Sequence, residues 1–416
     1  IASPSSAFMM LFVVLSVLLA AAQAQLPPGY DLIFSDEFNG QEIDLSKWEH
    51  EVTAGGGGNE EFQVYTPDSA NSYLQDGKLF VRPTLLADNI NPLTGEPFGE
   101  DFLTTGVLDL WGMYGICNVP DWNGCYRTGG DIPPIASGRV RSTLRFSHRY
   151  GYTEISAKMP VGDWTWPAMW MLPDKWYYGG WPMSGEIDII EAIGNRNYRC
   201  NGDLKGIQSM GSTLHWGVDW QQNKWHLTHT SISNEENNFG DFFHTYGFLW
   251  TPNGMEWFVD GQSILRVPEP WINDRPTSNC FTGFYDFGGP WSGPPRTPWT
   301  EDLTCDHFMA PFDQDYHYIF NVAVGSQWYF PQDGCVNWDG EAGRQKPWNN
   351  GEGQAQMMWD FYNAKDGWYD TWTNEGDNFA MQVDYIRVYQ PASFERTQVP
   401  DGCPVPPGPD NCPPPK

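Results

Sequence analysis

The chain has 416 residues, enough for one large domain or two ordinary ones, and its formal net charge is −29. This charge argues against nucleic acid and anionic membranes as partners, because proteins usually bind both through a basic surface. Glycine and proline number 44 and 34, and aromatic residues make up 16% of the chain. This composition favours a loop-rich all-β protein over a helical one.

The N-terminal segment has the pattern of a secretory signal. Residues 7–22 form an apolar run that is short for a membrane span, and Ala22-Gln23-Ala24 follows it as a cleavage site. We therefore expect residues 1–24 to be a signal peptide, with Gln25 as the new N-terminus. The predicted location of the protein is extracellular.

The cysteines are consistent with this location. There are eight, an even number, and they are too widely spread for a compact zinc site. We expect disulfides, with Cys117–Cys125 and Cys403–Cys412 as plausible local pairs. The sequence does not fix the connectivity.

The first half of the chain predicts short strands separated by loops. A strand and turn over Tyr30–Phe38 comes first, and a glycine-rich loop at 54–58 leads into another strand. Residues 71–83 are typical of a β-hairpin, because Asp76-Gly77 supplies its turn. Residues 86–137 are rich in Pro, Gly and Asn, and we expect a long loop held by Cys117 and Cys125.

Strands resume at 138–143 and 151–159, and a tryptophan-rich strand follows. Trp164, Trp166 and Trp170 share one parity, so that one face of this strand carries a row of indole rings. Such rings can stack on sugars, but a buried aromatic row in the core is the alternative.

Three carboxylates then fall within six residues, from Glu186 to Glu191. Glu186, Ile187, Asp188 and Ile189 alternate acid and aliphatic, as in a strand with one wet and one dry face. Strict alternation would bury Glu191 in the core, where an unpaired carboxylate is very costly. We therefore predict a β-bulge at Ile189-Ile190, which returns Glu191 to the acidic face.

This acid row suits glycoside hydrolysis with retention of configuration. One carboxylate attacks the anomeric carbon and another protonates the leaving oxygen, with carboxyl groups roughly 5 to 5.5 Å apart. Asp188 can share a proton with Glu186 and help to keep Glu191 protonated, because crowded like charges raise a carboxyl pKa. The alternative is an ordinary acid-faced strand without chemistry.

The second half predicts more strands and two irregular regions. Strands are expected at 213–216, 242–250, 255–259, 318–324 and 379–389, with a turn at Asp260-Gly261, while 270–311 is loop. Many short strands with long connections predict a single curved β-sandwich of the jelly-roll kind, over residues 25–391. Residues 392–416 form a Pro/Cys-rich tail.

The chain resembles glycoside hydrolase family 16, in particular laminarinase-like β-1,3-glucanases and the β-1,3-glucan recognition proteins of invertebrates. The strongest match is Trp181-Pro182-Met183-Ser184-Gly185 followed by Glu186-Ile187-Asp188-Ile189-Ile190-Glu191. Further matching segments are Gly58-Asn59-Glu60, Tyr65-Thr66, Ser137-Gly138-Arg139, Gly162–Pro173, Gly194-Asn195 and Val383–Tyr389.

The resemblance implies a substrate groove on the concave face of the sandwich. It also implies Glu186 as nucleophile, Glu191 as acid/base and Asp188 as the assisting residue. The residues expected to line the glucose-binding subsites are Asn59, Arg139, Trp166, Trp170, Trp181 and His215. No cofactor is expected for catalysis. The resemblance also suggests a structural calcium bound by Asp384, and the alternative is that Asp384 forms a salt bridge in the core.

The resemblance leaves two functions open. The first is a secreted, monomeric, retaining endo-β-1,3-glucanase that hydrolyses laminarin-like glucans, and the second is a non-catalytic β-1,3-glucan recognition protein. The intact Glu186, Asp188 and Glu191 favour the enzyme. Action on agar, carrageenan or xyloglucan is disfavoured by the six-residue spacing of the glutamates.

Overall fold

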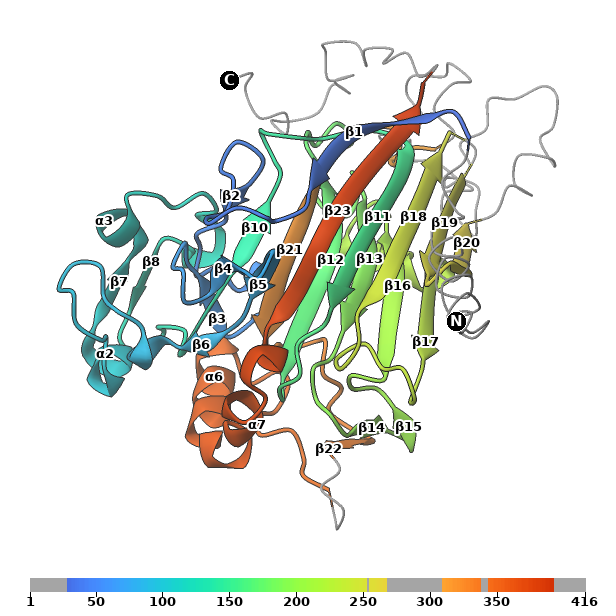
Figure 1. The fold of residues 1–416 in the computed structure, drawn as a ribbon. Helices are drawn as coiled ribbons and strands as arrows, with labels where there is room; N and C mark the ends of the chain where they lie inside the picture. Colours follow the sequence, from blue (N-terminus) through green and yellow to red (C-terminus); the bar gives the residue numbers. More distant parts are fainter. Residues whose placement is uncertain (1–27, 253, 268–308, 338–342, 393–416) are drawn as a thin grey trace, which may run out of the picture.

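The computed structural model describes residues 28–252, 254–267, 309–337 and 343–392. Two antiparallel sheets packed face to face dominate this part of the chain (Figure 1). The predicted all-β sandwich is therefore confirmed, although the signal peptide, residues 270–308 of the predicted loop and residues 393–416 of the tail lie outside the described residues. None of the helices in the described ranges has the length and apolarity of a membrane span.

The first sheet has eight strands among the described residues, and β23 lies near its centre. Its order is β20 (Gln262–Val267), β19 (Gly254–Val259), β18 (His244–Thr251), β11 (Gly151–Lys158), β23 (Met381–Pro391), β5 (Lys78–Val81) and β4 (Ser72–Gln75), with β1 (Tyr30–Asp36) paired to β23. The predicted hairpins at Asp76-Gly77 and Asp260-Gly261 join β4 to β5 and β19 to β20. All four turn residues have positive φ, as type I′ turns require.

The second sheet has seven strands in the described part of the chain and carries the acid row. Its order is β17 (His229–Ser233), β16 (Ser209–His215), β13 (Glu186–Ala192), β12 (Thr165–Pro173), β21 (Tyr316–Val324), β10 (Arg139–Arg141) and β2 (Glu49–His50). Strand β21 is buried along its whole length, and it pairs with β12 on one side and with β10 on the other.

Apolar side chains that point inward from β13 and its neighbouring strands fill the space between the two sheets. Ile187, Ile189 and Ile190 are at most 2% exposed and pack in one core with Met169, Phe248 and other apolar side chains of both sheets. Burying a side chain of this size stabilises the fold by about 1.5–3 kcal/mol. The opposite, outer face of the seven-stranded sheet is the acid face, defined by Trp166, Trp170, Glu186, Asp188, Glu191 and His215.

The region 86–137 is not the continuous loop that we predicted. It contains α2 (Glu100–Thr105), the hairpin of β7 (Val107–Asp109) and β8 (Tyr126–Thr128), α3 (Leu110–Tyr114) and β9 (Ile135–Ser137). Strand β9 joins β3 (Gln63–Tyr65) and β6 (Thr84–Leu85) in a small sheet. The short elements are held by buried side chains such as Leu103, Leu108 and Leu110, which lack a regular period along the chain.

Two helices near the C-terminus, α6 (Gln354–Asn363) and α7 (Asp370–Thr373), cover a second hydrophobic cluster. Trp164 lies in this cluster at 2% exposure, next to Trp348 and Tyr198. The prediction that three indoles share one face is thus wrong for Trp164. This residue lies just before β12 and has φ +67°, so its side chain does not follow the alternation of the strand.

The disulfides connect these outer elements. Cys117–Cys125 forms as predicted, and Cys200–Cys335 was not predicted. The second bond joins β14 (Tyr198–Cys200) to its neighbour β22 (Cys335–Asn337) in a small sheet, where β14 also pairs with β15 (Asp203–Leu204) on its other side. The predicted Cys403–Cys412 pair lies outside the described residues.

Candidate active site

The acid face depends on an irregular register in β13. Against β12, Trp170 pairs with Asp188 and Met169 with Ile190, so Ile189 has no partner across this ladder. The ladder with β16 shifts at the same place, between Asp188 and Glu191. The predicted bulge at Ile189-Ile190 is therefore confirmed, and it puts Glu191 on the same face as Glu186 and Asp188.

Glu186 stands at the start of β13 between an indole and an imidazole. Trp181 donates its indole N–H to Oε2 of Glu186 at 2.9 Å, and Nε2 of His215 lies 3.8 Å from Oε1. The cross-strand pairing of Glu186 with His215 explains why the two side chains share a face. The ring of Trp181 remains 40% exposed and lies 5.6 Å from that of His215.

Asp188 is the most enclosed member of the acid row, with 1% exposure. Its Oδ2 lies 3.3 Å from Nε2 of His215, and no hydrogen bond of ordinary geometry reaches this oxygen among the described residues. Its backbone carbonyl accepts the indole N–H of Trp257 from the opposite sheet. Asp188 is thus fixed in place while its carboxylate keeps free acceptor capacity.

Glu191 has its own aromatic support. Trp166 donates its indole N–H to Oε1 of Glu191 at 3.0 Å. The ring of Trp166 stacks on Tyr329, with centroids 3.9 Å apart and planes 5° from parallel. Trp166 and Tyr329 therefore hold the carboxyl of Glu191, just as Trp181 holds that of Glu186.

Burial raises the pKa of each of the three carboxyls, to about 8 in every case. For Glu186 and Glu191 the negative charge of Asp188 is the second cause of the raised pKa. Because the three groups interact, they titrate as a unit and share fewer than three negative charges near neutral pH. Strongly raised carboxyl pKa values in one cluster are typical of acid/base sites.

Trp170 and Arg139 form the next part of the acid face. The indole N–H of Trp170 donates to Oδ1 of Asn321 at 2.7 Å, and Nδ2 of Asn321 donates to the Tyr65 hydroxyl. The guanidinium of Arg139 lies 4.8 Å from the Trp170 ring centre and forms a salt bridge with Glu51. Arg139 is only 8% exposed and packs against the Trp170 ring, so it supports that ring from the side.

Asn59 lies in the loop after η1 (Gly56–Gly58), where its amide donates to Oε1 of Glu61 at 3.3 Å. The backbone carbonyl of Asn59 accepts the N–H of Gln327 at 3.0 Å, two residues before Tyr329, which stacks on Trp166; the Asn59 loop therefore lies toward the Glu191 end of the acid row. The structure thus brings Trp166, Trp170, Trp181 and His215 directly to the carboxylates or beside them. Asn59 instead bonds to Glu61, and Arg139 packs against Trp170.

Comparison with known proteins agrees with this architecture. The sequence profile of glycosyl hydrolases family 16 matches residues 131–280. A β-1,3-glucan-binding protein of Penaeus monodon is 41% identical over 376 residues, which cover 88% of this chain and 92% of that protein. The chain belongs to glycoside hydrolase family 16.

Two further comparisons give lower identity. A glucan endo-1,3-β-glucosidase A1 of Niallia circulans is 29% identical over 87% of this chain, but only 38% of that longer enzyme is covered. The solved structure of a non-specific endo-β-1,3(4)-glucanase of family 16 aligns with a TM-score of 0.50 at 20% identity, covering 88% of this chain and 96% of the other. This likeness supports the fold alone.

The calcium site that the family resemblance suggested has limited support in the side chains around Asp384. Oδ2 of Asp384 accepts a hydrogen bond from Ser156 at 3.4 Å. Among the described residues, the one group of three carboxylate or imidazole ligands close enough to hold a metal is Glu186, Asp188 and His215. Since Ca²⁺ takes six to eight oxygen ligands, the side chains at Asp384 do not fit it by themselves, and the ion stays a prediction.

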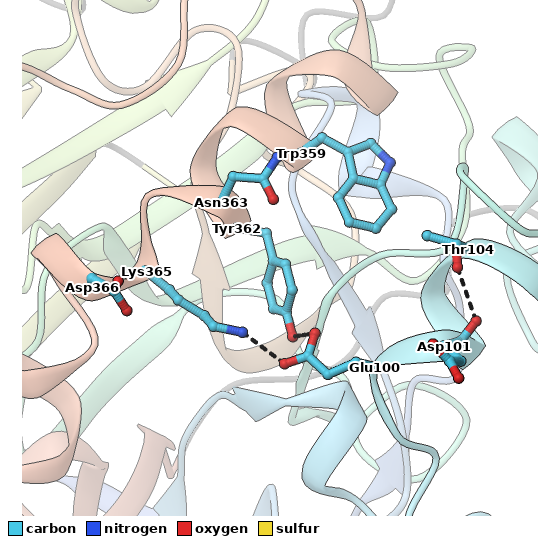
Figure 2. A pocket seen from close by; sticks show the side chains of 8 residues that line it. All are labelled: Glu100, Asp101, Thr104, Trp359, Tyr362, Asn363, Lys365 and Asp366. Carbon is cyan, nitrogen blue, oxygen red and sulfur yellow. Dashed lines mark hydrogen bonds and ion pairs between the residues drawn. The ribbon is translucent and has the colours of Figure 1, made fainter.

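A separate pocket of about 360 Å³ opens between α2 and α6, far along the chain from the acid row (Figure 2). Its central charges neutralise one another, because Glu100 accepts hydrogen bonds from Lys365 at 2.7 Å and from the Tyr362 hydroxyl at 2.6 Å. The bond between Tyr362 and Glu100 joins α6 to α2.

Sequence reasoning missed several residues of the family 16 site. Glu61, Asn223, Asn321 and Tyr329 contact the predicted residues from loops or from β21. Asn321 could have been found, because it interrupts an apolar strand at a position that alternation assigns to the outer face. The others depend on contacts between distant segments and have no local sequence signal.

Proposed function

We propose that the protein is a secreted endo-β-1,3-glucanase that hydrolyses laminarin-like glucans with retention of configuration. The observation that carries this proposal is the bulge in β13, since it aligns Glu186, Asp188 and Glu191 on one face. Glu186 and Glu191 each accept an indole N–H, which fixes their directions. Membership of family 16 supports the reaction class.

The proposed reaction has two steps. In the first, the Glu186 carboxylate attacks the anomeric carbon while Glu191 gives its proton to the departing glycosidic oxygen, so a covalent glycosyl-enzyme forms. In the second, Glu191 takes a proton from water, the hydroxide oxygen attacks the anomeric carbon, and Glu186 is released. Each step inverts the anomeric centre, and two inversions amount to retention.

The protonation pattern of the acid row fits this division of roles. Burial and the neighbouring Asp188 raise the pKa of Glu191 to about 8, so that it holds a proton at neutral pH. Glu186 must be ionised to attack, although burial raises its pKa as well. We assign Asp188 the task of carrying a shared proton, which lets the negative charge reside on Glu186.

Exposed and half-buried tryptophans supply the proposed sugar contacts. Trp181 flanks Glu186, Trp166 flanks Glu191, and Trp170 lies beside Asp188 across the strand pair. Aromatic faces suit neutral sugar rings, and the binding of a neutral glucan is not opposed by the net charge of −29. The expected glucan contacts also include Asn59, Arg139 and His215.

The proposed nucleophile is tested by Glu186→Gln. This variant keeps the shape of the side chain but removes the group that forms the covalent bond, so we expect turnover of laminarin to fall by at least about 10³-fold. Glucan binding, followed by calorimetry, should persist. Release of reducing sugar is the measurement, and Glu235→Gln at an exposed position is the matched control. Parent-like hydrolysis by the Glu186→Gln variant would show that the nucleophile is misassigned.

A β-1,3-glucan recognition protein without catalysis is the second candidate. The 41% identity to the Penaeus monodon β-1,3-glucan-binding protein favours it, and that relative aligns over nearly its whole length. The same assay separates the candidates. A parent protein that binds laminarin but releases no reducing sugar would be a recognition protein.

Secretion is part of the proposal. The apolar run at residues 7–22 supports a signal peptide, and the disulfides Cys117–Cys125 and Cys200–Cys335 are typical of an oxidising compartment. Expression of the full chain in insect cells, with N-terminal sequencing of protein from the medium, tests whether the mature chain begins at Gln25.

A further inference from the structure

Asn223 has an amide whose orientation is set by the backbone around it. It follows η4 (Trp220–Gln222), and its Oδ1 accepts the backbone N–H groups of Trp216 at 3.3 Å and of Trp225 at 3.2 Å. These two bonds use both acceptor positions of the oxygen. The amide nitrogen is therefore on the other side, where it lies 2.7 Å from Nδ1 of His215.

This contact decides which nitrogen of His215 carries the proton. An amide NH₂ group can only donate, so Nδ1 of His215 must accept. In a neutral imidazole the proton then resides on Nε2. Nε2 is the atom that lies 3.3 Å from Oδ2 of Asp188 and 3.8 Å from Oε1 of Glu186.

The same three residues have the geometry of a metal site. One ligand atom each from Glu186, Asp188 and His215 lies within 4.8 Å of the others, and Oδ2 of Asp188 is buried without an ordinary hydrogen bond. Three such ligands are enough for many zinc sites. A metal would need the lone pair of Nε2, however, and with Nδ1 already accepting from Asn223 the ring would have to lose both protons.

We infer that Asn223 is a positioning residue: it holds His215 as the Nε2–H tautomer, which keeps a hydrogen-bond donor between Asp188 and Glu186 and denies this face to divalent transition metals. Its importance for turnover rests on the proposed function. The tautomer and the exclusion of metal do not, because both follow from the hydrogen bonds alone.

Asn223→Asp reverses the direction of the hydrogen bond between residue 223 and Nδ1 of His215, with almost no change in side-chain shape. One carboxylate oxygen can still accept the backbone N–H groups of Trp216 and Trp225, while the other now accepts a proton from Nδ1 of His215. Carboxylate–histidine pairs of this kind orient the imidazole of zinc sites and affect metal affinity by about 10- to 100-fold. The substitution therefore converts Nε2 from a donor into a metal ligand.

The experiment compares the full-length parent with Asn223→Asp and the control Asn234→Asp. Asn234 is exposed, caps its own turn through Oδ1, and lies beyond the opposite end of β16, so that this control adds the same charge without touching His215. Histidine-labelled protein gives the His215 tautomer by NMR, with the signal assigned from His215→Gln. Calorimetry with ZnCl₂ gives the metal affinity.

We expect an Nε2–H ring in the parent and in Asn234→Asp, and an Nδ1–H ring in Asn223→Asp. We also expect Asn223→Asp to bind one Zn²⁺ at least about tenfold more tightly than the parent, with kcat for laminarin reduced about tenfold or more and KM little changed. An Nδ1–H ring in the parent would overturn the inference even if the variant did not fold. Equal zinc affinity of parent and Asn223→Asp would overturn it as well.

The kinetic readout separates this inference from the proposed function. If the parent releases no sugar from laminarin but shows the predicted tautomer and zinc response, the enzyme proposal fails and the role of Asn223 stands. If the parent hydrolyses laminarin but His215 is the Nδ1–H tautomer, the enzyme proposal stands and the role of Asn223 fails.

Discussion

At the scale of single residues, the acid row combines carboxylates with the ring nitrogens of aromatic side chains. Indole N–H groups of Trp181 and Trp166 and the imidazole of His215 contact the three acids, while Arg139 is paired with Glu51 at the edge of the group. No Lys or Arg side chain forms a salt bridge with Glu186, Asp188 or Glu191 within the described ranges. Burial therefore raises the pKa of all three acids without an Arg or Lys partner, and His215 opposes the rise only in part for Glu186 and Glu191.

This raised pKa predicts a stability that depends on pH. Burial raises the pKa of Asp188 from 3.8 to about 8, so between these pH values the folded state holds a proton that the unfolded chain has lost. The free energy of unfolding therefore falls as pH rises, by up to about 1.4 kcal/mol per pH unit for this proton. The contribution is complete below about pH 4 and lost above about pH 8.

Asp188→Asn removes this dependence, because the amide has no proton to release. We expect the variant to gain stability relative to the parent as the pH is raised from 5 to 8, measured by thermal unfolding at each pH. Asp203→Asn, at an exposed position, is the control and should follow the parent. A constant difference between Asp188→Asn and the parent over this range would contradict the assigned burial.

At the scale of the element, the bulge in β13 gives the strand one residue more than a regular alternation needs. Deletion of Ile190 should restore plain alternation, with Glu186, Asp188 and Glu191 still on the acid face. Deletion of Ile187 removes an equally buried isoleucine but turns Glu186 toward the core. The two deletions thus remove equally buried isoleucine side chains, a loss that by itself costs about 2–5 kcal/mol in each case.

We expect the Ile190 deletion to fold and to retain measurable laminarin hydrolysis, whereas the Ile187 deletion should be inactive or unfolded, because it buries a carboxylate without a partner. Circular dichroism and release of reducing sugar check both. Comparable activity in the two deletions would mean that strand alternation does not control the direction of these acids.

Elements with a strong local signal could be predicted from the sequence. The Asp-Gly turns indicated two hairpins, and the cost of burying Glu191 indicated the bulge in β13. The short helices α2 and α3 were missed, since five or six residues are too few for a periodic pattern. Helix α6 was missed as well, although Met357, Met358, Phe361 and Tyr362 are buried at the spacing of one helix face.

At the scale of the whole molecule, the sandwich brings distant segments to one face. Strand β21 carries Asn321 between Arg139 and Trp170, and the loop after β16 returns Asn223 to His215. Such contacts depend on strand order and loop path, so the sequence predicted the acids and their indoles but not the residues that orient them. Of the predicted indole row, only Trp166 and Trp170 reach the acid face.

The most direct test of the central claim is covalent trapping with a 2-deoxy-2-fluoro-β-laminaribiosyl fluoride. The fluorine slows breakdown of the glycosyl-enzyme, because it destabilises the positively charged transition state. We predict one sugar adduct per chain, located by mass spectrometry on the peptide that contains Glu186 and absent from Glu186→Gln. Hydrolysis of laminarin without any adduct, or with the adduct on another residue, would contradict the account.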